Sequence, residues 1–154
     1  MDFWDSFSDG QDLYLRLTGP VCARHGLTRT EFHVLMFLAN NPRFSTAADI
    51  VEKRHLSKSH VSVSVRALQE RGFLAGEYRE GNRRTVHLKL CPAAGRAVAD
   101  GQAAQAEFGA ALLRGFTREE QQAMQEFFRR IRQNAAEYRP AETEGEGKKD
   151  GASG

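Results

Sequence analysis

The segment 46–90 constrains the fold most, because its hydrophobic spacing changes from a helical period to a strand period at one glycine. Before Gly72, apolar residues recur at helical spacing over residues 46–54 and again over residues 57–71. Glycine tolerates the left-handed conformation that commonly ends a helix, so Gly72 is expected to stop the second one. Two helices joined by a very short turn predict a helix-turn-helix.

A β-hairpin is predicted immediately after these two helices. Residues 73–79 and 85–90 have the composition and alternation of strands, and residues 80–84 supply the turn and its polar, basic tip. A helix-turn-helix followed directly by a basic hairpin is a winged helix, so the predicted fold class is mainly α with a small β-hairpin wing.

The segments on either side of the winged helix are predicted to be helical. The expected helices span residues 2–23, 29–39, 92–114 and 117–138. Thr28 followed by Glu31 is a capping box, and the apolar residues of 29–39 nearly encircle that helix, so we expect it to be central and buried. Pro20 lies within the first helix, where we expect a kink or a break.

The charge of the chain is nearly balanced overall but concentrated locally. The 22 basic and 20 acidic residues give a net charge of +2. Nine basic residues (Lys53, Arg54, Lys58, Arg66, Arg71, Arg79, Arg83, Arg84 and Lys89) face three acidic ones (Glu70, Glu77 and Glu80) within residues 53–89. That segment therefore carries +6 and the remainder −4. A basic block of this kind indicates a polyanion-binding face, although a solvated surface would look the same.

Composition and motifs exclude several classes of protein. At 40% hydrophobic and 27% charged residues, the chain has ordinary globular composition, and its longest apolar run, residues 34–39, is far short of the roughly 20 residues of a membrane span. We expect no membrane association and, without a signal-like N-terminal segment, a cytoplasmic location. Two cysteines and five histidines without metal-ligand spacing predict no metal site and no cofactor. Without a nucleophile elbow, phosphate loop or paired acids, the chain is not expected to be an enzyme.

A family resemblance is carried by Leu27-Thr28 and by three later runs. These are residues 56–61 with residues 68–74, then Asn82-Arg83-Arg84 with residues 88–90, and finally Gly95. Together they resemble the MarR family of bacterial winged helix-turn-helix transcriptional regulators. The resemblance implies a homodimer built by the first, fifth and sixth helices, with its two lobes on a pseudo-palindromic operator. Many members of that family respond to a small-molecule effector, and others sense oxidants through cysteine.

The resemblance also gives the predicted segments their roles. Residues 1–26 are expected to form an N-terminal dimerisation helix, residues 27–91 the DNA-binding lobe, and residues 92–139 the C-terminal dimerisation helices. Residues 140–154 are expected to be a disordered tail, because their Gly, Glu, Lys and Ser cannot bury enough apolar area. The expected dimerisation residues are Phe3, Trp4, Phe7, Leu112, Leu113, Phe116, Phe127, Phe128 and Ile131.

The predicted recognition helix, residues 57–71, has two faces. Val61, Val65 and Leu68 share one stripe and should pack inward, which turns a mixed polar stripe outward. The candidate double-stranded DNA contacts are Ser57, Lys58, Ser59, His60, Ser62, Val63 and Arg66 on this helix, with Arg83 and Arg84 on the wing. Two of these have another expected role, since Ser57 would cap the helix and Arg84 would otherwise fold back onto an acid of its own lobe.

The effector and redox predictions rest on fewer residues. His33 on the central helix would line an effector cleft with Cys22, His25 and Phe37, unless it is simply a hydrogen-bonded core histidine. Cys91 stands where a helix-capping threonine is usual in the family, and a thiol at a helix amino terminus tends toward thiolate. We therefore expect a dimeric DNA-binding repressor modulated by a small-molecule effector. The alternatives are a winged-helix protein-interaction module and a redox-sensing regulator that uses Cys91.

Overall fold

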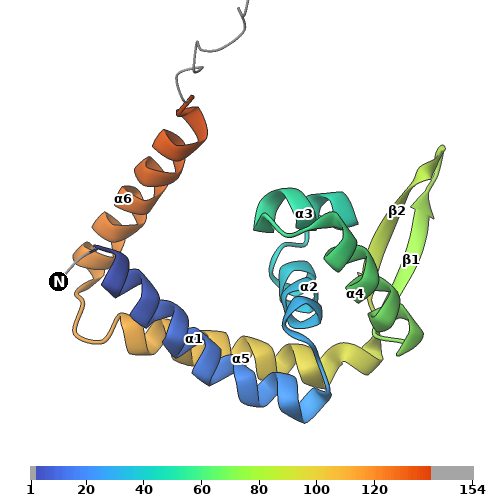
Figure 1. Ribbon diagram of the computed structural model, residues 1–154, viewed down its shortest axis with the longest axis horizontal. Helices are drawn as coiled ribbons and strands as arrows, with labels where there is room; N and C mark the ends of the chain where they lie inside the picture. Colours follow the sequence, from blue (N-terminus) through green and yellow to red (C-terminus); the bar gives the residue numbers. More distant parts are fainter. Residues whose placement is uncertain (1–2, 140–154) are drawn as a thin grey trace, which may run out of the picture. The chain divides into compact units, whose positions relative to one another are not determined.

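The structure, a computed structural model, describes the backbone of residues 3–139 and the side chains of residues 5–139 (Figure 1). Residues up to Arg114 form one compact unit, and residues from Gly115 form a second. The first unit contains α1 (Phe3–His25), α2 (Arg29–Asn40), α3 (Ala47–Arg54), α4 (Lys58–Glu70), β1 (Leu74–Arg79), β2 (Asn82–Leu90), the 3-10 turn η1 (Pro92–Ala94) and α5 (Gly95–Leu112). The second contains α6 (Arg118–Glu137). The predicted fold class, mainly α with a small hairpin, is confirmed.

Helix α1 continues through Pro20, so of the predicted kink or break the break is wrong. The side chain of Pro20 is exposed, and the carbonyl that loses its helical partner belongs to Arg16, which is also exposed. Water can hydrate that carbonyl, so the missing hydrogen bond does not end the helix. Helix α1 packs along α5, which helps to hold it continuous.

Helix α2 is the centre of the core, as its nearly all-round apolar pattern predicts. Its buried residues are Phe32, Val34, Leu35, Met36, Phe37 and Leu38. The helix contacts α4, α5 and β2, so each of its faces has an apolar neighbour. The predicted capping box is confirmed, with Thr28 Oγ1 accepting from the Glu31 amide at 3.1 Å and Glu31 Oε2 accepting from the Thr28 amide at 3.1 Å.

Helix α5 packs through small residues rather than large ones. Its buried residues are Ala97, Gly101 and Ala104. A Cβ atom added to Gly101 would lie 2.6 Å from Met36 Sδ and 3.0 Å from a ring carbon of Phe32. The closeness of α5 to α2 therefore depends on glycine at this position.

The hairpin has a tighter turn than the sequence predicts. Arg79 pairs with Asn82, so only Glu80 and Gly81 form the turn, and Gly81 takes a φ of +78° that suits glycine. Arg83 and Arg84 consequently lie in β2 next to the tip instead of in the turn itself. The register shifts between Tyr78 and Arg79, which marks an irregularity in the ladder close to the turn.

The base of the hairpin is tied to the loop that precedes α3. The Leu88 amide donates to the Ser45 carbonyl at 2.6 Å, and Ser45 Oγ lies 2.7 Å from His87 Nδ1. Asp49 in turn accepts hydrogen bonds from the Ser45 and Thr46 amides. These contacts join the base of the wing to the loop between α2 and α3.

In the second unit, α6 begins at the predicted capping box, in which Thr117 Oγ1 accepts from the Glu120 amide at 3.2 Å. None of the residues of α6 is buried. The predicted disordered tail, residues 140–154, and the side chains of Phe3 and Trp4 lie outside the described residues. Among residues 3–139, no helix has both the length and the hydropathy that a membrane span needs.

Candidate nucleic-acid interface

The ends of α4 are defined by its own side chains and by one glycine. Ser57 is the N-cap, and its hydroxyl accepts from the His60 amide at 3.1 Å. The same hydroxyl is 3.1 Å from Ser59 Oγ, so the two serines support each other at the exposed amino end of the helix. At the other end Gly72 adopts a φ of +71°, which confirms the predicted left-handed stop.

The two predicted faces of α4 are present in the structure. Val61, Val65 and Leu68 are buried against the core. All the candidate DNA contacts on this helix and its cap are exposed, namely Ser57, Lys58, Ser59, His60, Ser62, Val63 and Arg66. Val63 is 69% exposed, which leaves a branched apolar group open on an otherwise polar face. This face can therefore offer charged donors, hydroxyls and one apolar surface to a ligand.

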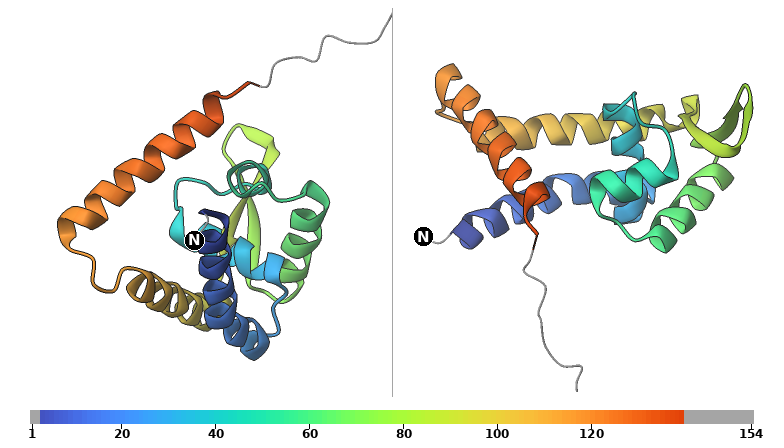
Figure 2. Two further views of the ribbon diagram at one scale, coloured as in Figure 1. Left: turned by 60° about the vertical axis from the view of Figure 1, so that its left-hand side comes forward. Right: turned by 90° about the horizontal axis from the view of Figure 1, so that it is seen from above.

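The hairpin, whose strands carry Arg79, Arg83, Arg84 and Lys89, lies beside α4 (Figure 2). Arg83 and Arg84 are exposed, and among residues 5–139 neither takes part in an ion pair. The structure thus does not show the alternative in which Arg84 folds back to pair with an acidic side chain of its own lobe. Asn82 Oδ1 accepts from the Arg84 amide at 2.9 Å, so the tip is held by a local hydrogen bond. An open hollow next to the turn is lined by Tyr78, Arg79, Glu80, Gly81 and Arg83.

Three of the nine basic residues of segment 53–89 are engaged on their own lobe. The Lys53 ammonium lies 5.2 Å from the Phe44 ring centre, and the Arg54 guanidinium lies 5.2 Å from that of Phe37. Arg71 is hydrogen-bonded to the end of α1. The other six have no hydrogen-bond or ion-pair partner for their side chains within residues 5–139, namely Lys58, Arg66, Arg79, Arg83, Arg84 and Lys89. The basic face is therefore concentrated on α4 and the hairpin.

The four predicted effector residues have different surroundings. Cys22 and Phe37 belong to the buried core, and burial raises the pKa of the Cys22 thiol. His25 is bound to Asp100 through Nε2 at 2.7 Å. His33 is half-buried on α2, where burial, with smaller contributions from Arg29 and Arg54, lowers its pKa and favours the neutral ring. An effector cleft at these four residues stays a prediction.

Most of the predicted dimerisation residues are exposed apolar side chains. In the first unit Phe7 and Leu112 are exposed and Leu113 is half-buried, and in the second Phe116, Phe127, Phe128 and Ile131 are exposed. On α6 the spacing of Phe127, Phe128 and Ile131 places them on one stripe. An exposed apolar stripe of this kind indicates an interaction site.

Cys91 stands at the amino end of a helical run. It is the N-cap of the three-residue 3-10 turn η1, which continues directly into α5 at Gly95. Its side chain makes no capping hydrogen bond, as expected for cysteine in place of threonine. The redox alternative at Cys91 stays a prediction. Within the described residues, no group of three histidine, cysteine or acidic side chains could hold a metal ion.

Comparisons with known proteins agree with this architecture. The sequence model of the MarR family matches residues 25–85, and no curated protein sequence matches the chain. The transcriptional regulator PA3341 is similar in structure, with a TM-score of 0.77 and 22% identity over 89% of this chain and 100% of that one. A MarR family transcriptional regulator from Listeria monocytogenes complexed with 26mer DNA has a TM-score of 0.73 and 12% identity, covering 88% and 89% of the two chains. Staphylococcus aureus MarR in complex with salicylate and kanamycin has a TM-score of 0.70 and 19% identity, covering 89% and 92%.

Proposed function

We propose that this protein, whose residues 25–85 match the MarR family and whose fold is that of MarR-type regulators, is a DNA-binding transcriptional repressor. The observation that carries the proposal is the exposed basic surface shared by α4 and the hairpin. Six cations without partners among residues 5–139 lie on these two elements, while the apolar residues of α4 face the core. The DNA complex of the structurally similar Listeria protein supports the same conclusion.

In the proposed complex, α4 enters the major groove with its amino end first. Lys58 and Ser59 would then meet base edges, with Val63 available for a thymine methyl group and Arg66 for phosphate. Arg83 and Arg84 beside the wing tip would reach the adjacent minor groove or its phosphates. These residues would have two kinds of role. Contacts with base edges would select the DNA sequence, and contacts with phosphates would fix the position of the protein along the duplex.

We further propose that the protein is a homodimer on a pseudo-palindromic operator. The support is the exposed stripe on α6 together with the exposed Phe7 and Leu112, which a second copy would cover. Two lobes related by a twofold axis would read two half-sites of one operator. Release from DNA by a small-molecule effector is part of the proposal, supported by the salicylate complex of the similar Staphylococcus aureus protein.

The first test is the salt dependence of DNA binding by an Arg83→Ala variant. Loss of one phosphate contact from each protomer of the proposed dimer is expected to weaken binding to all duplexes alike. It should reduce the slope of log K against log salt by about 1.8, which is about 0.9 for each of the two contacts. Fluorescence anisotropy at several salt concentrations measures both quantities. Arg16→Ala, which removes an exposed arginine of α1 that pairs with Asp12, is the matched control and should leave the slope unchanged.

An unaltered slope in Arg83→Ala would contradict the phosphate contact at the wing. If the unmodified protein shows no salt-dependent affinity for any duplex, the DNA-binding proposal itself fails. That outcome would favour the alternative of a winged-helix protein-interaction module. Such a module has no need for unpaired cations on both α4 and the hairpin, which is why the DNA-binding function is preferred.

A further inference from the structure

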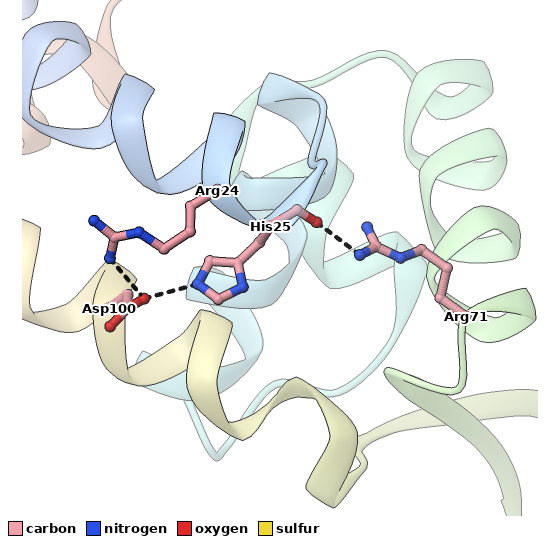
Figure 3. Close-up of polar contacts among 4 residues, drawn as sticks. All are labelled: Arg24, His25, Arg71 and Asp100. Atoms are coloured by element: carbon pink, nitrogen blue, oxygen red, sulfur yellow. Dashed lines mark hydrogen bonds and ion pairs between the residues drawn. The ribbon is translucent and has the colours of Figure 1, made fainter.

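The end of helix α1 is joined to the end of recognition helix α4 by a single arginine (Figure 3). Arg71 follows the last residue of α4, and its Nη2 donates to the carbonyl oxygen of His25 at 2.6 Å. Its Nη1 donates to the carbonyl oxygen of Gly26 at 3.1 Å. Carbonyls at a helix C-terminus have no partner within the helix, so the arginine satisfies two acceptors that water would otherwise take.

The C-terminal end of α1 also contacts α5, through Arg24 and His25. Asp100 Oδ2 lies 2.7 Å from His25 Nε2 and 3.0 Å from Arg24 Nη1 (Figure 3). The hydrogen bond from His25, together with that from Arg24, lowers the pKa of the Asp100 carboxyl, so it is ionised near neutral pH. His25 thus contacts α5 through its ring and Arg71 through its carbonyl, which links three elements at one residue.

We infer that Arg71 is a positioning residue for the recognition helix, an inference that rests on the proposed DNA-binding function. It lies between α4 and β1, the first strand of the wing, so its anchor at His25 and Gly26 holds the junction of the two DNA-facing elements against the end of α1. Through His25, that anchor is continuous with Asp100 of α5. The junction therefore fixes the recognition helix relative to α1 and α5 of the same chain.

Arg71 belongs to the basic block by sequence but is not free to act as a phosphate contact. Its guanidinium is engaged by two carbonyls and lies 4.4 Å from the Phe73 ring centre. Arginine suits this site because its planar group can donate two hydrogen bonds and stack on an aromatic face together. Lysine could supply the charge and N–H donors from one nitrogen, but neither the planar fork nor the stacking surface.

The test uses a duplex that the full-length protein selects from a random-sequence library, and a scrambled duplex of the same length. Arg71→Ala is expected to lower affinity for the selected duplex about tenfold and to leave affinity for the scrambled duplex and the salt slope unchanged. Positioning is needed to place both recognition helices in register, whereas nonspecific attraction needs only the charges of the face. Arg71→Lys should restore part of the lost affinity.

Two further variants distinguish positioning of the recognition helix from direct contact with DNA. Asp100→Asn removes the charge that holds Arg24 and His25, and it should produce the same loss of selectivity to a smaller degree. Arg66→Ala removes a proposed DNA contact, so it should weaken both duplexes and flatten the slope. All variants are compared at temperatures where circular dichroism shows them fully folded. If Arg71→Ala does not fold, Arg71→Lys and Asp100→Asn decide the inference.

The inference is overturned if Arg71→Ala flattens the salt slope and weakens both duplexes equally, because Arg71 would then be a phosphate contact. Unchanged affinity for the selected duplex would overturn it as well. Failure of the unmodified protein to select any duplex is a different result, since it removes the proposed function and not merely the role of Arg71.

Discussion

Replacing both Phe127 and Ile131 by glutamate is expected to convert the proposed dimer into a monomer and to lower operator affinity by more than about 100-fold. These side chains are 58% and 50% exposed in the single chain and lie on the apolar stripe of α6. If a second copy covers them, the variant would bury two carboxylates without partners, which costs several kcal/mol. A monomer would hold only one half-site and lose the gain of binding both together.

Sedimentation velocity gives the oligomeric state of this double variant, and anisotropy on a selected duplex gives its affinity. Gln122→Glu is the matched control, since it adds a carboxylate to an exposed position on the opposite side of α6. It should stay dimeric and bind as the unmodified protein does. If the double glutamate variant remains dimeric, the dimer interface lies elsewhere and the role given to this stripe is contradicted.

Features of the fold that depend only on residues close together in the sequence could be predicted. The capping boxes of α2 and α6 need only a threonine and a glutamate three residues later, and both formed as expected. The two faces of α4 follow from its helical period, because burying Val61 and Leu68 leaves no choice about which residues turn outward. The exposure of the candidate DNA contacts was therefore predictable from the helical period alone.

Features that depend on residues far apart in the chain could not be predicted in this way. The stripe of small residues on α5 becomes a packing face only because Met36 and Phe32 of α2 lie against Gly101. Arg71 looks like any other member of the basic block until the carbonyls at the end of α1 are placed next to it. The pairing of His25 with Asp100 spans 75 positions and has no local signal.

One error came from giving a local rule too much weight. Proline ends many helices, but Pro20 lies on an exposed face where solvent can compensate for the lost hydrogen bond. The surroundings of this residue, and not its type, decided that the helix continues.

The largest loss of stability is expected from Phe32→Ala. Phe32 has no exposed surface, and it packs at the centre of the core where α2 meets α5 near Gly101. Truncating a buried phenylalanine removes its transfer free energy and leaves a cavity, which together cost about 3–5 kcal/mol. A domain of this size has only about 5–15 kcal/mol of net stability, so the loss is a large fraction of the total.

Denaturant unfolding measures this loss, at one fixed protein concentration because a dimer's stability depends on concentration. Tyr78→Ala is the control for removing an aromatic ring, since Tyr78 is 59% exposed on the hairpin and its loss should cost no more than about 0.5 kcal/mol. Lower temperature should keep Phe32→Ala folded, and its salt slope on DNA should then equal that of the unmodified protein, because the cations of α4 and the wing are untouched. A cost below about 1 kcal/mol would contradict the central position given to α2, since only a residue with room to collapse around it can be truncated so cheaply.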